Sequence, residues 1–342
     1  MKIALDVMGG DYAPENNILG LKEAMDECKF VEKFVLVGQS KLIAEQLDKH
    51  RISDSRIELH EASQVVEMKD PSTICLRQKK DSSITVCSKL MKEGHVNAIV
   101  SAGHTGAAVA STVVLNRMIN GIERPGIATV FPSEKGAFVA LDVGANVDCK
   151  PINLSQYAIM GNVYSNQILG VENPRIGILS VGAEDGKGNE LTRESFSLIE
   201  KLPLNFVGNV EGHDLFSGHV DVVVCDGFVG NVLLKSCESL AKSMANLLRE
   251  QLSKTPVRKA GAILSSRAFK DLKKVTDYEE YGGAPLLGIN GTCIIAHGSS
   301  SPKAIKNAIR VCSEMVIKDV NAKISEGVNQ VNWTDLLEKE AD

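Results

Sequence analysis

One lysine of the chain, Lys187, stands between two glycines in a loop. The segment before it, RIGILSVG at 175–182, predicts a buried strand, and LTRESFSLIEKL at 191–202 predicts a helix. A loop lysine is most often a solvated surface charge. The alternative is a cation placed over an anion-binding site at a strand end, because the flanking glycines let the backbone come close to a ligand.

Two further segments have the composition of phosphate-binding turns, AGHTGA at 102–107 and HGSSSP at 297–302. Each opens a helix-like run, whose free N–H groups and partial positive charge attract an anion. The competing interpretation is helix capping alone, with Thr105 as the cap of the first turn and Pro302 at the first helical position of the second. Neither segment matches the G-x-G-x-x-G fingerprint or the lysine-bearing P-loop, so a dinucleotide site or nucleotide hydrolysis has little support.

Strand-like and helix-like runs alternate along the chain and would position these loops. Apolar runs such as KIALDVMG, FVLVG, AIVSAG, VDVVVCDG and CIIAHG are each followed by a longer helix-like stretch. Short apolar strands separated by helices predict an α/β fold with three layers and a doubly wound, mostly parallel sheet. No linker divides the chain, so we expect a single two-lobed catalytic unit over 1–330 and a tail at 331–342.

In open parallel sheets, ligands bind beyond the carboxyl ends of the strands. Glycine is frequent at these ends, where it allows backbone N–H groups to surround an anion. The predicted walls of the substrate and phosphate site are Asp6, Gly9, Gly10, Gly103, Thr105, Gly106, His297, Gly298 and Ser299.

Acidic residues near the strand ends raise the question of a metal site. Asp142 and Asp148, with Glu184 and Asp185, have the oxygen ligands that Mg²⁺ prefers. Acidic side chains at such positions also cap helices and stabilise turns, which is the stronger interpretation. The histidines do not cluster at metal-ligand spacing, and the G-x-S-x-G elbow of a serine hydrolase does not occur. We therefore predict no metal site.

The composition argues against several classes of function. Aromatic residues make up only 4% of the 342 residues and the net charge is -5, which gives little support to nucleic-acid binding. The eight cysteines form no C-x-x-C pair, which favours free thiols in a reducing cytoplasm. The N-terminal apolar run is too short for a signal peptide, and no run approaches the roughly 18 apolar residues of a membrane span. A cytoplasmic protein is expected.

One segment, 252–275, departs from the acidic character of the chain. It contains a single acid, Asp271, among apolar and basic side chains. The basic residues are Lys254, Arg258, Lys259, Arg267, Lys270, Lys273 and Lys274. A basic amphipathic protrusion of this kind suits a membrane surface or an acidic partner protein, and a solvated helix face is the plain alternative.

A series of segments, taken in chain order, resembles one protein family. The segments are DVMGGDYAPE, SAGHTGA, DVGANVDCKP, QYAIMGNVYS, GAEDGKGNELT, FVGNVEG, DVVVCDGFVGNVLLK, YGGAPLLG and AHGSS. From Met1 to about Val320, the chain resembles the phosphate acyltransferases of bacterial phospholipid synthesis, the PlsX type. So many motifs in the same order make the resemblance specific.

The resemblance implies a fold similar to those of phosphotransacetylases and of the isocitrate and isopropylmalate dehydrogenases. It implies transfer of a fatty acyl group from acyl carrier protein to inorganic phosphate, which yields an acyl phosphate for phospholipid synthesis. No metal, nucleotide or other cofactor is implied. The family resemblance further implies a homodimer on the cytoplasmic face of the membrane, where a membrane glycerol-3-phosphate acyltransferase uses the product.

The resemblance also assigns two catalytic residues. Lys187 matches the lysine of the family's EDxKGNE motif, and Asn231 matches the asparagine of its DGFxGN motif. Phosphate would attack the thioester directly, without a covalent acyl-enzyme, while an ammonium and an amide offset the developing negative charge. Two positions depart from the family pattern, Val7 in place of Ala and His104 in place of a frequent Asn. If His104 contacts phosphate, binding depends on pH, because histidine titrates near neutrality.

Three alternatives to this function stay open at the level of the sequence. A phosphotransacetylase acting on short acyl-CoA would have the same fold. A scaffold for lipid synthesis would bind membrane and partners without turnover. A dehydrogenase of the same fold is the weakest alternative and would require nicotinamide binding.

Overall fold

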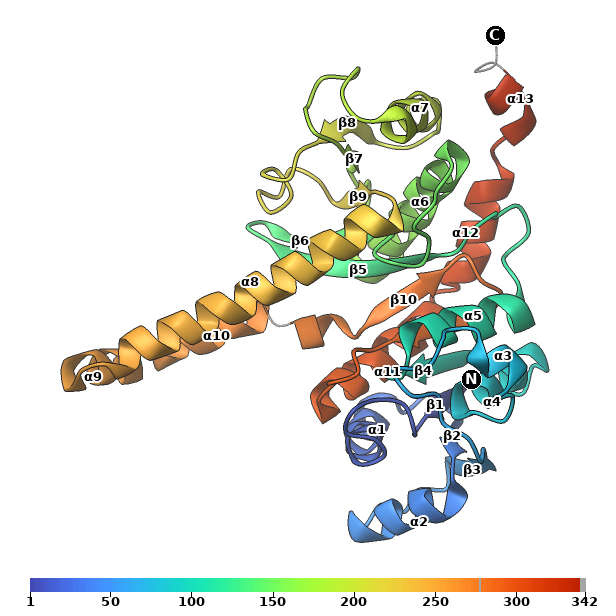
Figure 1. The fold of residues 1–342 in the computed structure, drawn as a ribbon, viewed down its shortest axis with the longest axis vertical. Helices are drawn as coiled ribbons and strands as arrows, with labels where there is room; N and C mark the ends of the chain where they lie inside the picture. Colours follow the sequence, from blue (N-terminus) through green and yellow to red (C-terminus); the bar gives the residue numbers. More distant parts are fainter. Residues whose placement is uncertain (277, 339–342) are drawn as a thin grey trace.

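The computed structural model describes residues 1–276 and 278–338, which form one large sheet covered by helices (Figure 1). The strands are β1 (Lys2–Asp6), β2 (Lys33–Gly38), β3 (Ile57–Glu61), β4 (Ala98–Ser101), β5 (Gly126–Ser133), β6 (Gly136–Leu141), β7 (Ile176–Leu179), β8 (Phe206–Val210), β9 (Val222–Val224), β10 (Ala284–Leu287) and β11 (Thr292–Ile295). The helices are α1 (Glu15–Glu27), α2 (Ser40–Lys49), α3 (Ile74–Arg77), α4 (Ser83–Lys92), α5 (Thr105–Asn116), α6 (Pro151–Tyr164), α7 (Glu190–Ile199), α8 (Gly227–Ser253), α9 (Pro256–Leu264), α10 (Ser266–Thr276), α11 (Pro302–Ile317), α12 (Val320–Asn329) and α13 (Trp333–Glu338). A π-helical turn, η1 (Ser165–Leu169), extends α6, and a 3₁₀ turn, η2 (Tyr278–Tyr281), precedes β10.

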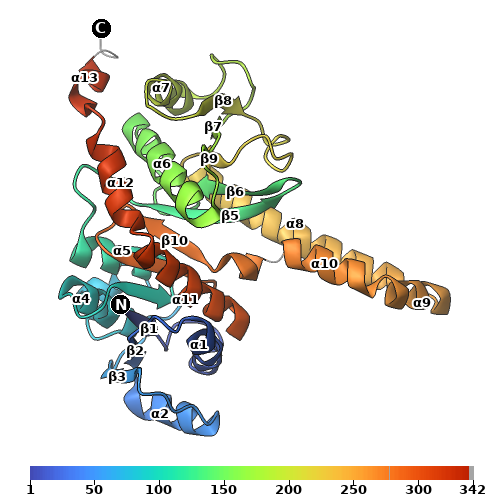
Figure 2. The same cartoon turned by 180° about the vertical axis from the view of Figure 1, so that it is seen from behind.

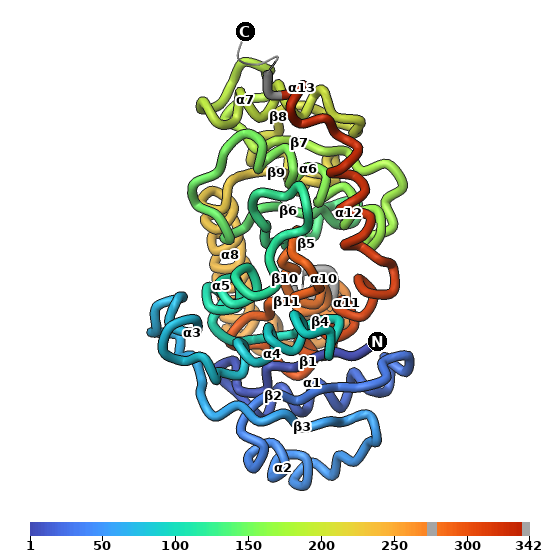
Figure 3. Tube along the Cα trace, turned by 90° about the vertical axis from the view of Figure 1, so that its right-hand side faces the viewer, coloured from blue at the N-terminus to red at the C-terminus, as the bar shows by residue number. Residues whose placement is uncertain are grey.

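The strands pair in the order β3-β2-β1-β4-β11-β10-β5-β6-β9-β7-β8, which Figure 3 shows from bottom to top. Most of them are short runs of aliphatic residues, such as β9 with three buried valines. Strands of this composition are typical of a sheet that is buried on both faces. Seven of the ten neighbouring pairs are parallel. The prediction of a mostly parallel sheet is confirmed.

Helices cover both faces of the sheet, which confirms the doubly wound, three-layer fold. One face packs against α1, α2, α6, α7, α11 and α12, whose core residues include Ile18, Tyr157 and Ile309. The other face packs against α3, α4, α5 and the beginning of α8, with Cys75 and Leu90 in its core. Figure 2, seen from behind, shows α6, α11 and α12 in front of the sheet.

The sheet also contains a reversal that the sequence pattern does not indicate. β10 is antiparallel to both β11 and β5, and β5 is antiparallel to β6. The parallel strands from β3 to β11 therefore run opposite to those from β6 to β8. Leu141, at the end of β6, lies opposite Ala128, and Ile294, near the end of β11, lies opposite Pro285. The register between β10 and β5 places Pro285 and Ala128 at the same level of the sheet. Leu141 and Ile294 are therefore level as well, so the carboxyl ends of both halves lie at the same height in the middle of the sheet.

Helices α8, α9 and α10 project from the body of the molecule (Figures 1 and 2). In α8, a helix of 27 residues, only Gly227 and Gly230 are buried, because the helix leaves the sheet after its first turns. The basic segment predicted at 252–275 forms the outer part of this projection. The side chains of Lys273 and Lys274 lie outside the described part of the structure.

The predicted tail at 331–342 is partly helical. Helix α13 occupies much of it, and Trp333 and Leu336 pack against the core on one face of the sheet. The indole N–H of Trp333 donates to the carbonyl oxygen of Val328 at 3.0 Å. Residues 339–342 of the tail lie outside the described residues.

Candidate active site

The loops after three neighbouring strands, β1, β4 and β11, meet at the carboxyl edge of the first half of the sheet. A Cβ on Gly9 would lie 2.7 Å from the amide nitrogen of Gly103, and one on Gly10 would lie 3.1 Å from the carbonyl oxygen of Gly298. The N–H of Asp11 donates to that carbonyl oxygen at 2.7 Å. The structure thus brings together four of the predicted glycines, and at Gly9 the facing backbone leaves no room for a side chain.

Asp6 lies beneath these loops rather than on their surface. Its side chain is buried, and its Oδ2 accepts a hydrogen bond from Ser101 Oγ at 2.6 Å. Ser101 Oγ in turn accepts one from the N–H of Gly103 at 3.1 Å. Burial raises the pKa of the Asp6 carboxyl, and the bond from the Ser101 hydroxyl acts against that shift. This geometry supports a role for Asp6 in holding the β1 and β4 loops together.

The predicted phosphate turn at 102–107 begins α5, but its cap is His104 and not Thr105. His104 Nδ1 accepts a hydrogen bond from the N–H of Ala107 at 3.2 Å, and Nε2 lies 3.0 Å from the carbonyl oxygen of Asp70. Both ring nitrogens are therefore engaged by the protein. The arrangement supports helix capping, the role that asparagine also performs well, and not the phosphate contact considered from the sequence.

A residue that sequence reasoning missed lies over the same turn. A Cβ on Gly106 would overlap the Ser72 hydroxyl, so Ser72 packs directly on the first turn of α5. The side chain of Thr105 is exposed beside it. The segment around Ser72 lies far from this turn in the sequence, and no motif in it indicated a contact with a phosphate turn.

The loop after β11 presents two exposed polar side chains. His297 Nδ1 lies 2.8 Å from Ser299 Oγ and accepts a hydrogen bond from the Ser299 N–H at 3.2 Å. Ser301 caps α11, and Pro302 occupies the first helical position, as predicted. His297 and Ser299 are therefore accessible beside the glycines of the neighbouring loops.

In the second half of the sheet, Asp142 follows the end of β6 and is fully buried. Its carboxylate accepts hydrogen bonds of 2.7–3.0 Å from the N–H groups of Ile127, Gly144, Ala145 and Asn146. Burial raises the pKa of this carboxyl, and the backbone donors act against the shift. So many donors support a structural role for Asp142. The other acidic residues considered for a metal are exposed, namely Asp148, Glu184 and Asp185.

Asn231 lies in the first turns of α8, next to the loop that follows β6. Asp226 caps this helix by accepting two backbone N–H groups of the first turn, both at 2.9 Å. A Cβ on Gly230 would overlap the carbonyl oxygen of Asp142, so the helix approaches the loop closely. A Cβ on Gly144 would lie 3.6 Å from Asn231 Oδ1. Asn231 is exposed at the carboxyl edge of β9.

Lys187 is exposed in the loop between β7 and α7. Its N–H donates to the carbonyl oxygen of Glu184 at 2.9 Å, which closes a tight turn. Its ammonium group makes no hydrogen bond or ion pair with the described residues of the chain. β7 and β9 are neighbours in the sheet, so the loops that carry Lys187 and Asn231 follow adjacent parallel strands.

The two groups of loops follow strands whose carboxyl ends lie at the same level on either side of the reversal of the sheet. The glycine-rich loops belong to the first half, and Lys187 and Asn231 belong to the second, whose carboxyl ends lie at the same level. A polar backbone surface suited to an anion thus lies on one side, and on the other lie an amide and an exposed cation that pairs with none of the described residues.

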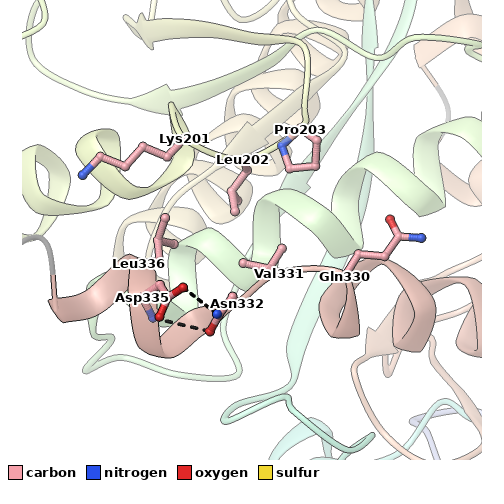
Figure 4. A pocket seen from close by; sticks show the side chains of 8 residues that line it. All are labelled: Lys201, Leu202, Pro203, Gln330, Val331, Asn332, Asp335 and Leu336. Carbon is pink, nitrogen blue, oxygen red and sulfur yellow. Dashed lines mark hydrogen bonds between the residues drawn. The ribbon is translucent and has the colours of Figure 1, made fainter.

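A cavity of about 340 Å³ lies apart from all of these residues (Figure 4). It is bounded by the end of α7 and by the segment from α12 to α13. Its lining residues are Lys201, Leu202, Pro203, Gln330, Val331, Asn332, Asp335 and Leu336. None of the predicted site residues lines this cavity.

No helix within 1–276 and 278–338 is both long and apolar enough to cross a bilayer. In the same residues, no three His, Cys, Asp or Glu side chains gather as metal ligands. The eight cysteines are all free, and six of them are buried.

Comparison with known proteins decides the family. A family model described as a fatty acid synthesis protein matches residues 1–323. A phosphate acyltransferase from Geobacter sulfurreducens is 49% identical over 326 residues, which cover 95% of this chain and 94% of the relative. This chain belongs to the phosphate acyltransferase family. A second member, from Desulfitobacterium hafniense, is 49% identical over 317 residues and covers 92% of this chain and 94% of its own length. The family resemblance read from the motifs is confirmed, and the chain belongs to a family of transferases.

Two solved structures that resemble this phosphate acyltransferase family member are distant from it in sequence. A phosphotransacetylase from Streptococcus pyogenes aligns over 93% of this chain and 94% of its own, with a TM-score of 0.60 and 17% identity. A branched-chain phosphotransacylase from Enterococcus faecalis covers 92% of this chain and 99% of its own, with a TM-score of 0.57 and 14% identity. At such identities the likeness shows the fold alone, and it confirms the predicted similarity to phosphotransacetylases.

Proposed function

We propose that this acyltransferase moves a fatty acyl group from acyl carrier protein to inorganic phosphate by direct attack of phosphate on the thioester. The observation that carries the proposal is the placement of both groups of loops at the level where the carboxyl ends of the two halves of the sheet coincide. Glycine backbone groups at the ends of β1, β4 and β11 suit a phosphate, and Lys187 and Asn231 follow adjacent strands of the facing half. Positioning both substrates in one site would itself lower the barrier.

Negative charge gathers on the phosphate, the carbonyl oxygen and the departing thiolate during this reaction. The ammonium of Lys187 is exposed and unpaired in the described chain, so it is available to offset that charge. The Asn231 amide can donate to the carbonyl oxygen as that oxygen becomes anionic. These two charge-stabilising roles correspond to Lys187 and Asn231, which follow adjacent strands in the second half of the sheet.

The cysteines near the site support direct attack over a covalent acyl-enzyme. Cys225 is buried and donates to the carbonyl oxygen of Asp142 at 3.4 Å, and burial raises the pKa of its thiol well above the ordinary value. Cys149 donates to the carbonyl oxygen of Asn146 at 3.4 Å, and burial likewise raises its pKa. Neither thiol has the exposed, low-pKa character of a nucleophile.

The experiment that tests the proposal compares acyl donors. Purified protein is incubated with phosphate and either palmitoyl carrier protein or acetyl-CoA, and acyl phosphate is trapped with hydroxylamine. We expect product from the carrier protein at a kcat/KM at least about tenfold higher than from acetyl-CoA, since only the former engages the protein surface as well as the thioester. Preference for acetyl-CoA would support a short-chain phosphotransacetylase, and no turnover with either donor would support a scaffold.

The helical projection supports a peripheral membrane position on the cytoplasmic side. At its tip, Val257, Ile263 and Leu264 are 82%, 73% and 87% exposed, beside the basic Arg258 and Lys259. Apolar side chains flanked by cations suit an anionic bilayer surface better than water. Docking of acidic carrier protein would use the same charges, and salt would weaken either interaction.

A vesicle experiment separates these two uses of the tip. We expect Leu264→Asp to lower sedimentation with anionic vesicles by about tenfold or more, because burial of one leucine contributes about 1.5–3 kcal/mol. Phe30→Asp, at an exposed apolar residue away from the projection, is the control and should bind vesicles as the wild type does. Unchanged vesicle binding with a raised KM for palmitoyl carrier protein would instead assign the tip to carrier docking.

The outer part of α8 supports a homodimer. Leu240, Met244, Leu247 and Leu248 are all exposed and recur at intervals of three and four residues, as on a helix face that pairs with another helix. A second copy of this chain presents the same apolar face and could cover it. A monomer in sedimentation velocity at micromolar concentration would contradict this proposal.

A further inference from the structure

The loop that carries Lys187 is tied to the neighbouring strand by one buried amide. Asn209, on β8, is only 8% exposed, and its Nδ2 donates to the carbonyl oxygen of Glu184 at 2.7 Å. The same carbonyl oxygen accepts the N–H of Lys187 at 2.9 Å. One acceptor therefore joins the turn at Lys187 to a strand of the rigid sheet.

The other end of the loop is held by α7. Asn189 caps this helix by accepting the N–H of Thr192 at 2.8 Å, and Arg193 Nη1 donates to the carbonyl oxygen of Gly188 at 2.7 Å. Gly188 has a φ of 111°, a conformation that favours glycine, and a Cβ there would lie 2.8 Å from Thr192 Cβ. Lys187 thus stands between two anchored peptide groups.

A third contact fixes the direction of the lysine side chain. A Cβ on Gly182 would lie 2.9 Å from Lys187 Cγ and 3.3 Å from its Cδ, so the aliphatic stem lies along the bare backbone of Gly182. Gly186, on the other side of the turn, would place a Cβ in open space. Gly182 therefore determines the direction of the Lys187 side chain, although it does not flank the lysine in the sequence.

We propose that Asn209 is a positioning residue for Lys187, which it holds in place through the Glu184 carbonyl group, with Gly182 guiding the stem of the side chain. The inference rests on the catalytic role of Lys187 in the proposed function. Asn209 itself does not reach the substrate, because it is buried under the loop. Its effect on the reaction should therefore pass entirely through the lysine.

A double-mutant cycle tests this dependence. Asn209→Ala in the wild-type background should lower kcat by about tenfold, with a small change in the KM for the acyl donor, because a small misplacement of a catalytic group is costly. In the Lys187→Ala background, the same substitution should have no further effect on the residual activity. A merely structural role would give the same loss in both backgrounds, and that result would overturn the proposal.

The double-mutant cycle has a matched control variant and two replacement variants. Asn205→Ala removes the same kind of bond in the same region, from Asn205 Nδ2 to the carbonyl oxygen of Asn173 at 3.2 Å, and should leave kcat unchanged. If Asn209→Ala does not fold, Arg193→Ala and Gly182→Ala take its place in the cycle. Gly182→Ala should lower kcat more than Gly186→Ala does, and equal effects would contradict the guiding role of Gly182.

The outcomes for the two proposals are distinguishable. Full activity of Lys187→Ala would show that Lys187 is not catalytic. That result would overturn both the role of the lysine in the proposed function and the positioning role of Asn209. A large loss in Lys187→Ala with additive effects of Asn209→Ala would leave the proposed function intact and overturn only the positioning role.

Discussion

Lys187→Ala is expected to lower kcat for acyl phosphate formation by about 10²–10³ while the protein stays folded. The side chain is exposed and its ammonium group bonds to no described residue, so its removal leaves no buried group unpaired. The loss should therefore come from the transition state alone. The measurement is kcat and KM for palmitoyl carrier protein and phosphate, together with the midpoint of thermal unfolding.

An exposed lysine far from the site provides the control for this variant. Lys41→Ala, on α2, also removes an exposed cation and should match the wild type in every parameter. If Lys187→Ala keeps full kcat, Lys187 is a solvated surface charge and the catalytic assignment moves to Asn231 and the glycine loops. A large rise in the KM for phosphate with kcat unchanged would mean that the lysine contributes ground-state binding alone.

Gly230→Ala is expected to destabilise the fold by about 3 kcal/mol, near the upper end of the usual cost of overpacking. The added Cβ would overlap a backbone atom, the carbonyl oxygen of Asp142, and would lie 3.0 Å from Cys225 Sγ. A backbone carbonyl held by its own loop cannot rotate away as a side chain can. The first turns of α8 must therefore shift, and Asn231, the next residue, shifts with them. We expect a lower midpoint of thermal unfolding and a lower kcat in the folded fraction.

A second glycine on the same projection provides a matched control. A Cβ on Gly261, in α9, would meet no atom within 4 Å. Gly261→Ala should leave the midpoint unchanged or raise it, because alanine favours a helix by about 0.8–1 kcal/mol over glycine. Equal midpoints for Gly230→Ala and the wild type would show that α8 can move away from the β6 loop without cost.

Much of this protein follows from local sequence. Short aliphatic runs separated by helix-like stretches predict a mostly parallel sheet, and that prediction holds because a strand buried on both faces must be apolar throughout. The ordered motifs identify the family, which the comparisons confirm. The position of Pro302 at the start of α11 was also predicted from the sequence, because helix starts depend on a few adjacent residues.

The contacts between segments far apart in the chain were decided only by the tertiary structure. The reversal at β10 and β5 is a matter of pairing partners, and an antiparallel strand of four residues has the same composition as a parallel one. Asp6 and Asp142 both follow the pattern of an exposed strand-end acid, yet both are buried under the loops that they hold.

The assignment of His104 as a cap and of Asn209 as an anchor has the same origin. His104 is engaged by the carbonyl group of Asp70, and Asn209 by that of Glu184, and both are backbone groups from other segments. A sequence reports which side chains can donate or accept a hydrogen bond. Which distant carbonyl group they meet depends on how the sheet twists and the loops pack, and that information is absent from any local pattern.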